Sequence, residues 1–233
     1  MKHDPRFWDR IADRYYRKPI AEPEIYREKL RLTRELLDAD ARLLELGCGT
    51  GGTAVAHAPH VARVHAVDIS ERMLELGRAQ ARREGVDNIV FERADIADFD
   101  APRSAYDAVL GLSVLHLVDD RDETIANVHR MLRPGGVFVS STVCLRDVAP
   151  WFALVAPLGR ALGLFPLVRA FTGHELVTSL ERAGFEIERR WLPGKRQALF
   201  VVARKPLDGR APRTLSEVNG SPQEGTPGAL AIR

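Results

Sequence analysis

A glycine-rich segment at residues 47–52 has the features that bring a backbone close to a ligand. It follows the apolar run 42–46 and precedes a short helical pattern at 53–58. Glycines let the backbone pass against a ligand with no side chain in the way. The free N–H groups of a helix N-terminus then face the bound group. The sequence therefore predicts a cofactor-binding turn made of Gly47, Cys48, Gly49, Thr50 and Gly51.

Two aspartates follow later apolar runs and would supply hydrogen-bond acceptors to the same ligand. Asp68 closes the run 63–67, where a carboxylate accepts hydrogen bonds from both hydroxyls of a ribose. Asp95 follows the run 88–92 and is placed to accept a hydrogen bond from an adenine amino group. Because the carboxyl ends of parallel strands lie at one edge of a sheet, the turn and both aspartates would meet there. Together they predict a site for a cofactor that contains adenosine.

Two classes of cofactor satisfy this pattern. The glycines also fit the G-x-G-x-x-G pattern of dinucleotide folds, so a nicotinamide-dependent oxidoreductase is the alternative. Glu45 favours the other class, because an acidic side chain suits a cationic ligand and opposes a pyrophosphate. An oxidoreductase would also need a proton donor such as Tyr-x-x-x-Lys, and the residue four positions after Tyr106 is a leucine. S-adenosylmethionine, a sulfonium cation, is therefore the favoured cofactor.

The elements that would position these residues alternate along the chain. Strands are predicted over 42–46, 63–67, 88–92, 106–111, 137–142, 185–191 and 198–203, and helices over 53–58, 71–83, 122–132 and 172–184, the second capped by Ser70. Strands that alternate with helices require crossovers, which give a mostly parallel sheet with helices on both faces. The last two strands are joined by a hairpin-type link and must be antiparallel. The predicted fold is a doubly wound, seven-stranded α/β sheet with one antiparallel strand, preceded by two helices within residues 7–37.

The sequence resembles the class I S-adenosylmethionine-dependent methyltransferases that act on small molecules, on the motifs at 43–52, 66–70, 93–96, 112–116 and 131–136. The resemblance covers residues 42–204 and implies a Rossmann-like methyltransferase fold with S-adenosylmethionine as cofactor. It places the turn and Glu45 around the methionine part of the cofactor, and Asp68 on its ribose. The further contacts that it implies are Ile69 and Met73 on the adenine ring, Asp95 with Ile96 at the adenine edge, and Leu112 beneath the methionine.

Methyl transfer from a sulfonium mainly requires that the acceptor be aligned and desolvated, because the leaving group is already activated. A general base helps when the acceptor is a hydroxyl. His116 is predicted on a loop at the carboxyl edge of the sheet and is the candidate base, with a packing or capping role as the alternative. Tyr15 is predicted to cover the cofactor, with a place in the core as the alternative. The sequence does not specify the acceptor atom.

Three parts are predicted along the chain. They are an N-terminal helical cap at 1–40, a cofactor-binding methyltransferase domain at 41–204 and a disordered tail at 205–233. The stretch 145–172 is unusually apolar for a connection and is interpreted as a cover over an apolar or aromatic acceptor. A dimer interface or a surface helix that touches a membrane is the alternative.

The composition limits the partners. The 233 residues carry 34 basic and 32 acidic side chains without a long block of one sign, which does not favour nucleic acid. Cys48 and Cys144 stand alone, so neither a disulfide framework nor a metal site is predicted, and a cytoplasmic location is favoured. Charges and prolines interrupt the apolar stretch, so stable membrane insertion is not expected. We expect an enzyme with a small-molecule acceptor, and keep a non-catalytic S-adenosylmethionine-binding protein as a second alternative.

Overall fold

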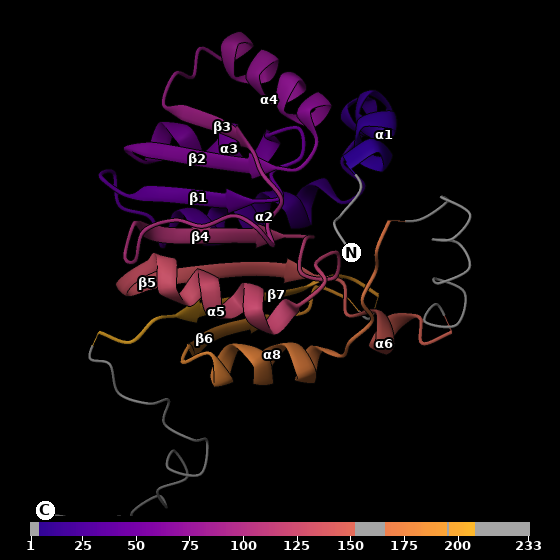
Figure 1. Ribbon diagram of the computed structural model, residues 1–233, viewed down its shortest axis with the longest axis vertical. Helices are drawn as coiled ribbons and strands as arrows, with labels where there is room; N and C mark the ends of the chain where they lie inside the picture. Colours follow the sequence, from indigo (N-terminus) through magenta and orange to yellow (C-terminus); the bar gives the residue numbers. More distant parts are fainter. Residues whose placement is uncertain (1–4, 152–165, 195, 208–233) are drawn as a thin grey trace, which may run out of the picture.

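A seven-stranded sheet forms the centre of the computed structural model, which describes residues 5–151, 166–194 and 196–207. The strand order is β3-β2-β1-β4-β5-β7-β6 (Figure 1). The strands are β1 (Arg42–Leu46), β2 (Arg63–Asp68), β3 (Ile89–Arg93), β4 (Tyr106–Leu112), β5 (Leu132–Thr142), β6 (Glu186–Trp191) and β7 (Leu199–Arg204). β7 is antiparallel to β5 and β6, and the other neighbouring pairs are parallel. The predicted sheet with one antiparallel strand is confirmed.

The order of the strands reverses at β1. The chain moves from β1 to β2 and β3 on one side, and β4 and β5 lie on the other. Open α/β sheets bind ligands at such a switch point, in the crevice outside the carboxyl ends of the strands. The topology therefore marks the edge at which the glycine turn follows β1.

Helices cover both faces of the sheet. They are α1 (Pro5–Arg17), α2 (Pro23–Arg34), α3 (Gly52–His57), the 3₁₀ turn η1 (Ala58–His60), α4 (Glu71–Arg83), α5 (Arg121–Met131), α6 (Leu145–Val148) and α8 (Gly173–Arg182). One apolar core lies under α2, α3 and α4, and a second lies under α5 and α8. Side chains alternate along a strand, so Leu43 joins the first core and Leu44 the second.

Helix caps that the sequence predicts are present. The Ser70 hydroxyl accepts a hydrogen bond from the backbone N–H of Met73 and starts α4. Thr172 and Glu175 form a reciprocal capping box at the start of α8. Such caps satisfy backbone N–H groups that have no partner within the helix. They fix where each helix begins after its strand.

The segment between α5 and β5 differs from the prediction. Leu132 is already in β5 rather than at the end of the helix, and it pairs with Tyr106 of β4. Gly135 and Gly136 exchange backbone hydrogen bonds with Lys205 beyond the end of β7. This partner is remote in sequence, so a local pattern could not reveal that the strand starts five residues earlier than predicted. The short helix α6 was also not predicted.

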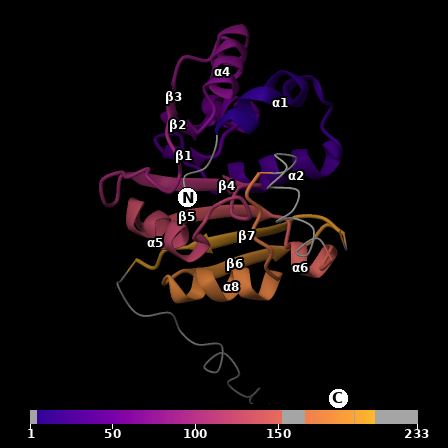
Figure 2. The same cartoon turned by 45° about the vertical axis from the view of Figure 1, so that its right-hand side comes forward.

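Helix α1 docks beside α4 at the carboxyl edge of the sheet (Figure 2). The Asp9 carboxylate accepts hydrogen bonds from the Ser70 hydroxyl, at 2.6 Å, and from the Arg72 backbone N–H. The Arg72 guanidinium pairs with Asp13 at 2.7 Å. The N-terminal segment is thus fixed to the start of α4, while its boundary as a separate helical cap stays a prediction.

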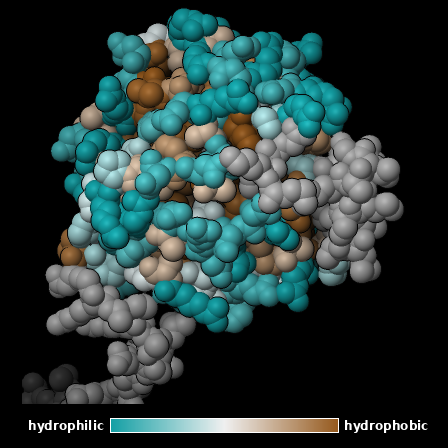
Figure 3. Space-filling view, in the orientation of Figure 1, coloured by the Kyte–Doolittle hydropathy of each residue, from teal (hydrophilic) through white to brown (hydrophobic). Residues whose placement is uncertain are grey.

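Much of the predicted acceptor cover, residues 152–165, and the tail from residue 208 lie outside the described residues. Among the described residues, no helix is both long and apolar enough to cross a membrane. On the face shown in Figure 3, polar side chains cover most of the described surface, and apolar ones appear in small patches. Neither Cys48 nor Cys144 is in a disulfide, and both are buried.

His57, at the end of α3, has no exposed surface. Neither of its ring nitrogens has a hydrogen-bond partner among the described residues. The pKa of His57 is lowered to about 4, mainly by burial and to a smaller extent by the positive charges of Arg34 and His60. The folded state therefore binds fewer protons than the unfolded state between about pH 6.5 and pH 4, and stability is lost as the pH falls through that window.

We expect replacement of His57 by leucine to reduce the acid sensitivity of folding. The wild-type chain should lose about 3 kcal/mol of unfolding free energy through this residue between pH 6.5 and pH 4. Urea unfolding at a series of pH values measures the loss, with the exposed His174→Gln variant as a matched control. An unchanged pH dependence in His57→Leu would contradict the assignment.

Candidate functional site

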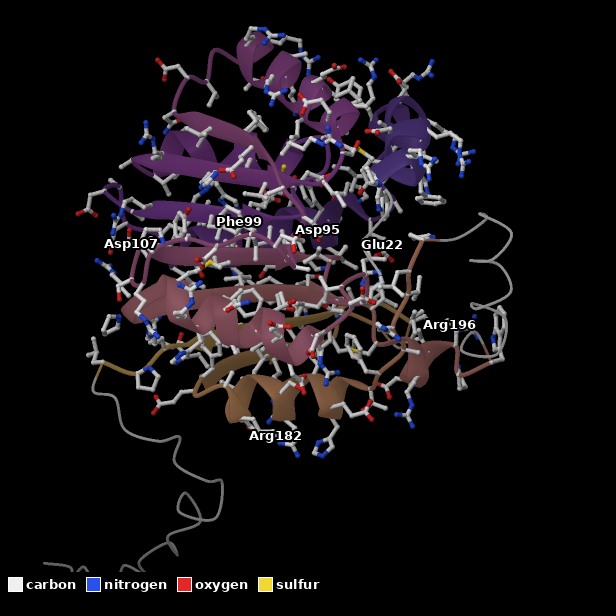
Figure 4. The ribbon with its side chains drawn as sticks, viewed as in Figure 1. Glu22, Asp95, Phe99, Asp107, Arg182 and Arg196 are labelled. Atoms are coloured by element: carbon white, nitrogen blue, oxygen red, sulfur yellow. The ribbon has the colours of Figure 1, made fainter. Side chains whose placement is uncertain are left out.

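A cavity of about 470 Å³ lies at the carboxyl edge of the sheet, where the topology places a ligand. In Figure 4, Asp95 lies at this edge, and Asp107 lies at the opposite edge. Ten of the residues predicted from the sequence line the cavity. They are Tyr15, Gly47, Gly49, Asp68, Ile69, Met73, Asp95, Ile96, Leu112 and His116.

All three glycines of the turn have positive φ, a backbone conformation that side chains disfavour. Gly47 has φ +67°, and a Cβ there would stand 2.7 Å from a methyl carbon of Val114. Gly49 has φ +53°, and a Cβ there would meet no protein atom within 4 Å. Gly47 is therefore required for packing, whereas the space beside Gly49 is free for a ligand.

Asp68 ties the turn to the next strand. Its two carboxylate oxygens accept hydrogen bonds from the backbone N–H of Gly49, at 2.8 Å, and of Ser70, at 2.9 Å. Burial raises the pKa of Asp68 above its ordinary value, and the backbone donors act in the opposite direction. Each carboxylate oxygen can accept a second hydrogen bond, so the side chain remains able to receive ribose hydroxyls from the cavity.

The predicted adenine contacts lie together on the wall next to Asp68. Ile69 follows Asp68 directly, and Met73, which is buried, stands one turn into α4. Ile96 faces the cavity beside Asp95, whose carboxylate accepts a hydrogen bond from the Ala97 N–H at 3.1 Å. This arrangement offers apolar surfaces for a flat ring and a carboxylate at its edge.

Glu45 is not among the residues that line the cavity. It shares the strand face of Leu43, and its carboxyl is almost completely buried. Its Oε2 has no hydrogen-bond partner among the described residues. Burial and the Asp68 charge raise the pKa of Glu45 to about 8. A cation nearby would favour its ionised form, and its contact with the cofactor stays a prediction.

Three other predicted contacts do not line the cavity. Cys48 is buried, and its thiol donates to the Gly49 carbonyl at 3.7 Å. Burial raises the pKa of this thiol well above its usual value, which makes it an inert packed residue. Gly51 begins α3 with φ +74°, and a Cβ there would stand 2.9 Å from the Phe91 ring. Thr50, between them, is half-buried.

The sequence analysis missed Tyr26. Its hydroxyl lies 3.5 Å from the Thr53 hydroxyl, and the Glu45 and Tyr15 charges both act on its pKa, which burial raises above its usual value. Tyr15 and Tyr26 thus come from α1 and α2 to the same side of the glycine turn. No motif marks Tyr26, because a contact between α2 and α3 depends on how the two helices pack.

The sequence also did not identify much of the apolar wall. The wall residues that it missed are Phe7, Trp8, Ile11, Leu117 and Val118, whereas Ser113 and Val114 fall in the 112–116 motif and Pro166 and Val168 fall in the predicted cover. In the sequence, the first three indicated only an amphipathic helix face. Phe7 and Trp8 meet edge to face with ring centroids 5.2 Å apart, so α1 presents an aromatic pair to the cavity.

His116 lies on the cavity wall after β4. Burial lowers the pKa of this imidazole to about 4, so it is neutral at physiological pH. Its Nδ1 is buried and has no hydrogen-bond partner among the described residues, while its backbone carbonyl accepts from the Arg169 N–H at 2.8 Å. The structure therefore provides an uncharged ring with an unused nitrogen beside the cavity.

The residues present fit an adenosyl sulfonium ligand. The free space beside Gly49, the carboxylate of Asp68 and the unpartnered buried oxygen of Glu45 are the observations that support the fit. They match a ligand with a ribose and a positive charge.

Comparison with known proteins identifies a methyltransferase domain in this chain. Residues 43–136 match the model of a methyltransferase domain. The chain is 38% identical over 102 residues to 27-O-demethylrifamycin SV methyltransferase from Amycolatopsis mediterranei, an alignment that covers 43% of this chain and 38% of that protein. A solved S-adenosylmethionine-dependent methyltransferase from Mesorhizobium loti is 26% identical with a TM-score of 0.65, over 76% of this chain and 96% of the other.

Residues 43–136 thus carry a methyltransferase domain, and the chain is similar to S-adenosylmethionine-dependent methyltransferases. S-adenosylmethionine is its cofactor, and the nicotinamide alternative is set aside. The chain matches only about two-fifths of the rifamycin relative. A further relative, 34% identical over 105 residues and aligned with 44% of this chain and 36% of that protein, is an S-adenosyl-L-methionine-dependent Diels-Alderase from Talaromyces variabilis. Proteins that resemble this chain therefore differ in the reaction that their names describe.

We expect Gly49→Ala to weaken cofactor binding by more than the loss of folding stability alone would explain. The matched control is Gly85→Ala, because Gly85 also has a positive φ, +68°, with nothing within 4 Å of its Cβ position. Both variants should lose about 1–2 kcal/mol of stability, the cost of an alanine in the left-handed region. Only Gly49→Ala should bind S-adenosylhomocysteine at least tenfold more weakly, as measured by calorimetry. Equal affinities in the two variants would contradict this assignment.

Proposed function

We propose that this methyltransferase moves the methyl group of S-adenosylmethionine to a small apolar or aromatic acceptor. The observation that carries the proposal is the division of the cavity into two kinds of wall. Backbone and carboxylate groups from Gly49, Asp68 and Asp95 line one part. Apolar side chains line the other part, and they include Phe7, Trp8, Ile11, Leu117, Val118, Pro166 and Val168.

The apolar wall would hold and dehydrate the acceptor. When bound, S-adenosylmethionine supplies a methyl group that is attached to a positively charged sulfur. The sulfur becomes a neutral thioether when the methyl group is transferred. Alignment of two reacting groups supplies about 7–11 kcal/mol of rate enhancement in favourable cases. We assign that alignment to α1 and to residues 112–118, because these segments bring the apolar wall up to the cofactor part of the cavity.

His116 would accept the proton that an acceptor hydroxyl releases. Its ring is neutral and lines the same cavity, so an unprotonated ring nitrogen is available to a hydroxyl that binds there. Tyr15 would cover the cofactor from α1, since it lies on the cavity wall and is 53% exposed. A dimer interface or a membrane contact for residues 145–172 is kept as the alternative to a cover. A cytoplasmic location is part of the same proposal.

A second candidate is a reaction in which S-adenosylmethionine is bound but not consumed. The Diels-Alderase relative favours it, because that name describes a cyclisation. The two candidates differ in one product. Methyl transfer releases one S-adenosylhomocysteine for each acceptor molecule that reacts, whereas a cyclisation releases none.

We expect His116→Gln to slow methyl transfer to hydroxyl acceptors by about 100-fold or more in kcat/KM, because a glutamine cannot take the proton. Acceptors come from a panel of phenols and aliphatic alcohols, and S-adenosylhomocysteine release measures turnover. The affinity for S-adenosylmethionine should change less than threefold.

His174→Gln, on the exposed start of α8, is the matched control and should retain wild-type turnover. If His116→Gln keeps kcat/KM within threefold of wild type, His116 is a packed wall residue rather than a base. If acceptors react while no S-adenosylhomocysteine forms, methyl transfer is the wrong reaction for this chain.

A further inference from the structure

A second cavity adjoins the first along α1. It measures about 640 Å³ and is lined by Ile11, Arg14, Tyr15, Arg17 and Lys18. Ile11 and Tyr15 line both cavities. The two spaces therefore meet at these side chains, with an apolar wall on one side and three basic side chains on the other.

The same face of α1 changes character along its length. Residues 11 and 15 lie one helical turn apart on one side of α1, and Lys18 directly follows the helix, with its N–H bonded to the Tyr15 carbonyl at 3.2 Å. The side begins with the aromatic pair Phe7 and Trp8 and ends with Arg14 and Lys18. At about 1.5 Å per residue, Ile11 and Arg17 lie about 9 Å apart along the helix axis. A ligand that spans both cavities would thus meet apolar groups first and cations about two turns later.

Arg14 and Lys18 are not neutralised by the acids of α1, whereas the Arg17 charge acts on Asp13. Asp9 bonds to the start of α4, and Asp13 pairs with Arg72. Arg17 donates to the Asp13 backbone carbonyl at 3.1 Å. Within the described ranges, no carboxylate lies within ion-pair distance of Arg14 or Lys18. Favourable interaction with the helix dipole explains basic residues at a helix C-terminus, but it does not require that they line a cavity.

We infer that the acceptor is an amphiphilic anion, whose apolar body enters the 470 Å³ cavity and whose carboxylate or phosphate binds Arg14, Arg17 and Lys18. This inference rests on the proposed function and names the acceptor class for the same site. Arginine and lysine are the usual partners of such anions. Their exposure makes the interaction sensitive to salt, because exposed charges are screened.

The experiment uses the full chain saturated with S-adenosylhomocysteine. Decanoate, decyl phosphate and decanol are titrated by calorimetry, since the three share an apolar chain and differ in the charged group. We expect both anions to bind at least tenfold more tightly than decanol, and the advantage to shrink between 50 and 300 mM salt, a range chosen to change screening. The two anions separate a carboxylate preference from a phosphate preference.

The variant Arg14→Gln/Lys18→Gln should lose the preference for anions while its affinity for S-adenosylhomocysteine stays within threefold of wild type. Arg82→Gln, an exposed arginine in the last turn of α4, is the matched control and should behave as wild type. Equal binding of decanol and decanoate by the wild-type chain would overturn the inference. A loss of S-adenosylhomocysteine affinity in the double variant would also overturn it, because the cations would then serve the cofactor. Failure of the wild-type chain to bind S-adenosylhomocysteine would instead contradict the proposed function.

Discussion

The hydrogen bonds that Asp68 accepts from Gly49 and Ser70 hold the cofactor edge together. One joins the end of β2 to the glycine turn after β1, and the other orders the start of α4. Ser70 in turn caps α4 and bonds to Asp9 of α1. A single buried carboxylate thus connects two strand ends to the helix that lies over the cavity. Loss of this side chain would leave two backbone donors without partners, a cost of about 1–3 kcal/mol for each buried group.

The position of α1 determines what the cavity can accept. Its acidic side chains face α4, where Asp9 and Asp13 bond to Ser70 and Arg72. Phe7, Trp8 and Tyr15 line the first cavity instead, and Arg14 and Arg17 line the second. The helix is therefore fixed by polar contacts on one side while its other side remains available for a ligand. This separation explains how a segment outside the sheet contributes Phe7, Trp8 and Ile11 to the apolar wall.

The fold and the cofactor part of the site could be predicted because their signals are local. Strand patterns, turn glycines and the Ser70 cap depend on neighbouring residues. Tyr26 and the apolar wall of α1 could not be found, because their positions depend on the packing of helices that are far apart in sequence. Glu45 is an intermediate case. The alternation of side chains along β1 already places it on the same face of the sheet as Leu43 and away from Leu44, whereas its burial depends on the packing around β1.

The most direct test is a crystal structure of the chain with S-adenosylhomocysteine. The account predicts that the ribose hydroxyls lie within hydrogen-bond distance of the Asp68 carboxylate, about 2.6–3.2 Å. The adenine ring should lie among Ile69, Met73 and Ile96, with its edge toward Asp95. A ligand bound elsewhere, or bound at this edge without contact to Asp68, would contradict the account.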